Sequence, residues 1–412
     1  MSLRTLCILW SLFFLFFYHP VLASESTRLL KADCHIHLVD FLQNGEYWSE
    51  LDQAFIPPSP KITLPSGQRG ARIVGILKRM DAAGVTVAMV HGMPFVKKWS
   101  SMDRQRPLYY LDNESRVLVA RDTDYTVALA FQDFLATGGS SAIQARKRLY
   151  PFMCGFDATD MGSVDMAVKR IKEFPGMWDG IGEIMSRHDD LTNLTSDERP
   201  CANHPALHRL SDFAGTVFLP LSIHHNIAPV SAGNIPRLPL YLNELEELVD
   251  EHPQTQFMWC HAGVSRRVVV DNLPKIIRVF LTENNRSKHV HIDLSWVVYE
   301  DYIYREATPS QAGIDNRDQW ASLIQEFPHT FMIGSDKVAN FETYTQEICK
   351  YTPLFKTLSK LPTGNLLVQN LALNNFYTLM ESLRKKRGGL GATLPPSYQY
   401  PEENYVHPKK TY

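Results

Sequence analysis

Short apolar runs of strand length alternate with segments of helical periodicity from about residue 30 onward. In the helical segments, apolar side chains recur near a spacing of 3.6 residues. These segments are residues 73–80, 164–174, 240–249 and 319–327. The alternation is typical of repeated βα units, so it predicts an α/β fold, a (β/α)8 TIM-like barrel in a single domain. The expected strands are residues 31–38, 85–91, 149–156, 180–185, 216–224, 256–261, 289–295 and 330–336.

Two long segments, residues 39–70 and 92–122, follow the first and second expected strands. Loops that follow the strands of a barrel stand over its active-site face, so these two segments are candidate walls of a substrate pocket. The barrel domain is expected to span residues 24–388. Residues 389–412 form a proline-containing C-terminal tail.

The first segment, residues 1–23, has the anatomy of a secretory signal peptide. Arg4 precedes an uncharged apolar run, and small residues follow at Ala23 and Ser24. Cleavage is favoured over an uncleaved anchor, which needs about 20 apolar residues. We therefore predict an exported protein, periplasmic or extracellular, with no stable membrane insertion after cleavage. N-terminal sequencing should show a mature chain that begins near Ser24, whereas an intact Arg4 on membrane-bound protein would favour the anchor.

The charge balance argues against nucleic acid as a partner. Lys and Arg total 42 against 44 Asp and Glu, and the one basic run is the short segment 384–387. The expected partner is a small-molecule substrate, and a homo-oligomer is compatible with the sequence. The cysteines number 6, too sparse for a disulfide framework in a chain of 412 residues.

Two histidines end the first expected strand, in the sequence Asp33-Cys34-His35-Ile36-His37. Because successive side chains of a strand point to opposite faces, His35 and His37 share one face and can chelate a metal ion. By the same alternation, Cys34 and Cys260 are expected to face away from their histidine neighbours as buried apolar side chains.

Other expected strands also end in an ionisable residue. Such residues are costly to bury without a charge partner, and a barrel brings the carboxyl ends of its strands to one mouth. Packing alone does not explain this recurrence, which predicts a site for a divalent metal ion. Its candidate residues are His35, His37, Glu183, His224, His261 and Asp336.

Further motifs accompany these residues: residues 77–85, Gly-Ser-Asp at 334–336 and Asn-Leu-Ala at 370–372. In this order they resemble the amidohydrolase superfamily, and more closely its amidohydrolase-related branch (amidohydrolase 2), over about residues 31–380. The resemblance implies a metal-dependent hydrolase that acts on an ester, lactone, amide or related bond through a metal-activated water. The same branch includes metal-dependent decarboxylases, and a catalytically inactive barrel used for binding is the third alternative.

By this resemblance, the ion would be held by His35, His37, His224 and Asp336, with His261 beside it. Zinc is the expected metal. Asp336 and His261 would be the catalytic residues, Asp336 as the base. Many relatives bridge two ions with a carboxylated lysine where this chain has Glu183. Glu183 would either bridge two ions or turn away to a helix N-terminus or to an arginine such as Arg187, and one ion is favoured over two.

Four residues near the expected strand ends could contact the substrate. They are His91, Arg187, His188 and Lys337.

Overall fold

The computed structural model describes residues 29–38, 47–49, 54–56, 71–93, 123–188, 200–233, 235–305, 314–338 and 341–395. The signal segment, nearly all of both long insertions and most of the C-terminal tail lie outside these ranges. Within them, no helix combines the length and the apolar character that a membrane crossing requires.

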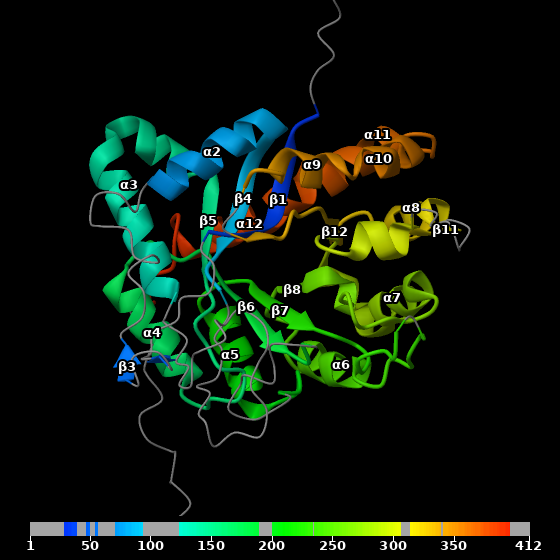
Figure 1. Cartoon of the computed structure of the whole chain (residues 1–412), viewed down its shortest axis with the longest axis horizontal. Helices are drawn as coiled ribbons and strands as arrows, with labels where there is room; N and C mark the ends of the chain where they lie inside the picture. Colours follow the sequence, from blue (N-terminus) through cyan, green and yellow to red (C-terminus); the bar gives the residue numbers. More distant parts are fainter. Residues whose placement is uncertain are drawn as a thin grey trace, which may run out of the picture.

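A closed parallel barrel forms the centre of the molecule (Figure 1). The strands that pair around it are β1 (Lys31–His37), β4 (Val85–His91), β5 (Leu149–Met153), β6 (Gly180–Ser186), β7 (Leu221–His225), β8 (Phe257–Trp259) and β9 (Val290–Asp293). The eighth strand is split into β12 (Phe331–Met332), which pairs with β9, and β13 (Lys337–Val338), which pairs with β1. The predicted barrel is therefore confirmed.

The largest difference from the predicted strand boundaries lies at the start of β7. Residue 216 is not in a strand, because helix α5 continues to Thr216 and β7 begins only at Leu221. Between them the backbone turns at Phe218, whose φ of 54° is left-handed. An apolar run thus contained the end of a helix, a turn and a strand, which periodicity alone does not separate.

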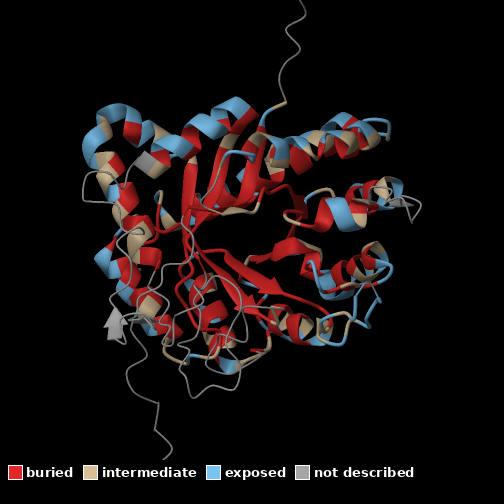
Figure 2. Ribbon diagram, viewed as in Figure 1, coloured by how far each residue is buried: buried red, intermediate tan, exposed pale blue. Residues whose placement is uncertain are grey.

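The helices surround the barrel and present their buried sides to it (Figure 2). They are α2 (Ala71–Ala83), α3 (Thr123–Arg146), α4 (Ser163–Glu173), α5 (Pro205–Thr216), α6 (Leu242–Glu251), α7 (Leu273–Thr282), α8 (Arg317–Glu326), α9 (Tyr344–Cys349), α10 (Thr352–Leu358), α11 (Gly364–Gln369) and α12 (Asn375–Arg387). Two small antiparallel pairs lie outside the barrel, β2 (Tyr47–Ser49) with β3 (Ala54–Ile56), and β10 (Tyr304–Arg305) with β11 (Ile314–Asp315).

Alternation of the strand side chains divides the core in two. One cluster fills the space between strands and helices, with Ile36, Val90 and Ile223 among its members. The other cluster fills the barrel interior with side chains such as Met89 and Tyr150, and α12 packs against it. The barrel thus has an apolar floor, and the polar residues gather at the carboxyl ends of its strands.

A buried carboxylate ties α12 to the barrel. Asp179, just before β6, is fully buried and accepts hydrogen bonds from Arg146, Arg384 and Arg387. Arg384 also stacks 3.5 Å from the ring centroid of Tyr150. These contacts neutralise one buried charge with guanidinium groups from two helices, so Asp179 is the electrostatic anchor of the C-terminal helix.

We expect Asp179→Ala to lower the free energy of unfolding by about 3–5 kcal/mol, because it leaves buried guanidinium groups without a carboxylate. Urea denaturation followed by circular dichroism measures the change. As a control, Asp318→Ala removes an exposed carboxylate at the start of α8 and should cost less than about 1 kcal/mol. Equal effects of the two substitutions would contradict the anchoring role.

Candidate metal centre

Strand β1 delivers two imidazoles to the barrel mouth. Nε2 of His35 and Nε2 of His37 lie 3.1 Å apart, and both rings are buried. The carboxylate of Asp33 fixes the local backbone by accepting hydrogen bonds from the amides of His35 and Ser335, at 3.0 and 2.9 Å. Asp33 therefore ties β1 to the eighth strand beside the two histidines.

The protonation of these two rings is set by their outer nitrogens. Nδ1 of His35 faces Asp293 Oδ2 at 2.8 Å, and Nδ1 of His37 faces the carbonyl oxygen of Gly92 at 2.5 Å. Carboxylate and carbonyl oxygens accept hydrogen bonds, so each Nδ1 carries a proton, and the two Nε2 atoms are directed at each other. Either a proton on one Nε2 or a metal ion must stand between them.

Two carboxylate oxygens complete this first donor group. Glu183 Oε2 lies 3.6 Å from each Nε2, and Asp336 Oδ1 lies 3.6 Å from the Nε2 of His35 and 3.3 Å from that of His37. A tetrahedral ion with bonds of 2.0–2.2 Å holds its ligands roughly 3.4 Å apart. The spacing and the donor types of these residues therefore fit a divalent metal ion such as zinc.

Glu183 turns its other oxygen to a second donor group. Oε1 lies 2.9 Å from Nδ1 of His224 and 3.4 Å from Nε2 of His261. The Glu183 carboxylate thus stands between the two groups and faces both. Glu183 does not turn away to Arg187, because Arg187 pairs instead with Glu244 at 3.0 and 2.5 Å.

Gly182 allows Glu183 to reach this position. Its φ of 113° is unfavourable for any other residue, and a Cβ there would lie 2.1 Å from the carbonyl oxygen of Ser222 on β7. The close approach of β6 and β7 brings Glu183 and His224 together, so the glycine before the carboxylate is a requirement of the site.

The mouth carries an excess of negative charge. Burial alone would raise the pKa of Glu183 and Asp336, but the facing imidazoles lower it below the usual carboxyl value. Burial lowers the pKa of His35, and the neighbouring Glu183 and Asp293 raise it well above its usual value. A proton on His35 neutralises part of this negative charge. A divalent ion would neutralise more of it, because it would contact all donors of the first group at once.

Asp293 is a site residue that the sequence analysis missed. Besides His35, its Oδ2 accepts a hydrogen bond of 2.6 Å from Ser295 Oγ, and Ser295 Oγ lies 2.9 Å from Nδ1 of His261. One carboxylate therefore orients histidines of both donor groups. The sequence does contain a pattern that could have identified Asp293, because it is an ionisable residue in the apolar strand β9. Glu183 was selected by the same criterion.

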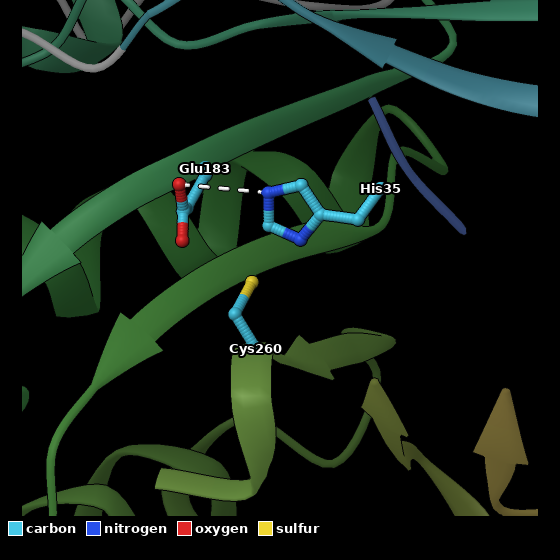
Figure 3. A group of neighbouring side chains, drawn as sticks. All are labelled: His35, Glu183 and Cys260. Carbon is cyan, nitrogen blue, oxygen red and sulfur yellow. Dashed lines mark ion pairs between the residues drawn. The ribbon is translucent and has the colours of Figure 1, made fainter. Parts of the chain in front are cut away.

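Cys260 contradicts the sequence prediction. It does not face away from His261: its Sγ lies within 4.8 Å of donor atoms of His35 and Glu183, and the three side chains point toward one another (Figure 3). Strand β8 ends at Trp259, and His261 and Ala262 have left-handed φ values of 53° and 50°. Cys260 keeps the inward direction of Met258, two residues earlier, and the left-handed turn brings His261 to the mouth as well. Burial raises the pKa of the Cys260 thiol to about 12, so it is not a free thiolate.

Two of the predicted substrate-contact residues lie beside the donor groups. The rings of His91 and His35 have centroids 4.9 Å apart, and those of His188 and His224 are 4.4 Å apart. Burial lowers the pKa of both His91 and His188 well below the usual value, so both are neutral at pH 7. Both ring nitrogens of His91 lack a hydrogen-bond partner among the described residues.

The other two predicted contacts have different partners. Arg187 binds Glu244 and stacks 4.3 Å from the ring centroid of Tyr241. Lys337 donates a hydrogen bond of 2.7 Å to Thr343. The structure also places Trp296, which the sequence analysis did not consider, with its ring centroid 5.1 Å from that of His261. Trp296 and His188 thus form an aromatic side of the mouth.

This chain is similar to known proteins in structure and not in sequence. The sequence matches no family model and no curated protein. A similar solved structure is an amidohydrolase from Burkholderia multivorans with bound zinc, at 14% identity and a TM-score of 0.47 over 85% of this chain and 99% of that chain.

Two further similar structures come from other bacteria. A TIM-barrel protein from Bordetella bronchiseptica has 10% identity and a TM-score of 0.46 over 86% of this chain and 99% of that one. Dihydroorotase from Campylobacter jejuni has 12% identity and a TM-score of 0.43 over 85% of this chain and 83% of that chain. Amidohydrolases, the superfamily that the sequence motifs resemble, are thus among these structures. The function proposed below rests on the donor atoms of this chain.

Proposed function

We propose that this protein is a metal-dependent hydrolase that cleaves an ester, lactone, amide or related bond of a small molecule. The observation that carries the proposal is the first donor group, in which two imidazole lone pairs and two carboxylate oxygens converge at the mouth of a barrel. A divalent ion held by His35, His37, Glu183 and Asp336 would acidify water and polarise the oxygen of a scissile bond.

The residues of the chain supply the remaining steps. The Asp336 side chain is 14% exposed and that of Glu183 only 2%, so Asp336 is the carboxylate nearest to solvent. It would accept a proton from the attacking water and return it to the leaving group. With a single ion bound at the first donor group, His261, which is held by Ser295, would stabilise negative charge on the substrate oxygen. His91, His188 and Trp296 would form the walls of the pocket.

Metal removal tests the proposal. We expect dialysis against a chelator to abolish turnover but to leave the barrel folded, because the donors lie on strands of a packed core. Metal analysis, circular dichroism and assays on lactones, esters, amides, phosphoesters and aromatic carboxylates are the measurements. Turnover should return with zinc, manganese or cobalt.

Two outcomes would overturn the hydrolase proposal. The first is purified protein without stoichiometric metal that gains no activity when metal is added. The second is release of carbon dioxide from aromatic carboxylates without hydrolysis of any ester, lactone or amide, which would identify a decarboxylase instead.

A further inference from the structure

A second group of metal-binding side chains lies outside the barrel, between α5 and the end of α6. Nδ1 of His208, on α5, is 2.9 Å from Nε2 of His252 and 3.1 Å from Oε2 of Glu251, the last residue of α6. The donor atoms of these three residues all lie within 4.8 Å of one another. None of the three belongs to the barrel mouth.

Asp212 sets the protonation of His252. Its Oδ1 lies 2.8 Å from Nδ1 of His252, and because a carboxylate accepts, that nitrogen carries the ring proton. The Nε2 lone pair is therefore directed at His208. The His252 side chain is only 6% exposed, so its orientation is fixed by packing as well as by Asp212. A carboxylate behind a histidine in this way is the usual support of a metal-binding imidazole.

Without a metal ion, this arrangement leaves one proton for two acceptors. The Nδ1 proton of a neutral His208 would have to serve both the lone pair of His252 and the carboxylate of Glu251. A divalent cation instead accepts a lone pair from all three residues. The separations of 2.9 and 3.1 Å are shorter than the roughly 3.4 Å between ligands of a tetrahedral ion, so a bound ion would move these donor atoms slightly apart.

We propose that His208, Glu251 and His252 form a peripheral site for a divalent transition-metal ion, with Zn²⁺ as the best fit and Asp212 as the positioning residue. Two imidazoles and a carboxylate suit zinc, whereas calcium and magnesium prefer oxygen ligands. The Glu251 side chain is 59% exposed, so an ion can enter from solvent. A bound ion would clamp α5 to α6, the helices on either side of β7, and so stabilise the strand that carries His224.

The test uses the full mature chain and Zn²⁺ as the probe. We expect Glu251→Gln and His208→Gln to hold one zinc ion fewer per chain than the wild type, with unchanged turnover. With the barrel mouth already loaded with metal, a hundredfold excess of Zn²⁺ over the Kd of the peripheral site should raise the Tm of the wild type by about 3 °C and leave that of the two variants unchanged. Glu247→Gln is the matched control, since this carboxylate of α6 lies outside the cluster and accepts a hydrogen bond from Asn203.

Equal zinc content and equal Tm shifts in the wild type and both variants would overturn the proposal. So would a loss of zinc that is accompanied by a parallel loss of turnover, because it would place the effect at the barrel mouth. Glu251 is largely exposed, so Glu251→Gln decides the question even if the His208 variant does not fold. Absorption of Co²⁺ in the same proteins checks that the ligands include nitrogen.

Discussion

Asp336→Asn is expected to lower turnover by about 10²-fold or more while the protein keeps its metal ion. An asparagine retains the shape and an oxygen donor toward His37, but it cannot accept the proton of the attacking water. Because Asp336 is the most solvent-accessible carboxylate of the mouth, no second carboxylate in the described ranges takes over this role. Steady-state kinetics and metal analysis of the same preparation measure the two quantities.

Asp318→Asn serves as the control for Asp336→Asn, since it makes the same chemical change at an exposed position of helix α8 and should leave turnover unchanged. Unchanged turnover in Asp336→Asn would contradict the role of base. His261→Asn then distinguishes the alternatives. If this substitution alone abolishes turnover and the metal content is unchanged, His261 is the base, and Asp336 is only a ligand.

The barrel and four of the six candidate donors could be predicted because they depend on strands. These donors are His35, His37, Glu183 and His224. In a parallel barrel, the last residues of each strand reach one mouth, so an ionisable residue at a strand end is enough to place it. His35 and Glu183 were found in this way although 148 positions separate them in the chain. The prediction needed no knowledge of the loops.

The failures occur where the backbone leaves the strand conformation. Cys260 and His261 both face the mouth because the chain is left-handed at His261, and a sequence gives no direct signal for a positive φ at a histidine. Arg187 also has a positive φ, 51°, and its side chain runs to Glu244 instead of the mouth. Pairing partners of long side chains depend on tertiary contacts that periodicity does not contain.

The number of ions at the mouth is the point on which sequence and geometry differ most. The sequence favoured one ion, because a glutamate stands where many relatives have a carboxylated lysine. The two oxygens of Glu183 nevertheless face separate donor groups, His35 with His37 and His224 with His261. We therefore propose that the mouth can hold two ions, which Glu183 would bridge, and that His261 would then be a ligand of the second ion and not a donor to the substrate oxygen.

Glu183→Gln should then lower the metal content of the mouth from two ions per chain toward one, because a neutral amide bridges two cations poorly, and turnover should fall at least as far as in Asp336→Asn. The count is made in a protein that also carries Glu251→Gln, so that the peripheral site does not contribute. Ser222→Ala is a neighbouring control on β7 that leaves the donors intact. If Glu183→Gln keeps all of its metal and loses only stability, the carboxylate is a charge partner of the histidines, and a single ion remains the better description.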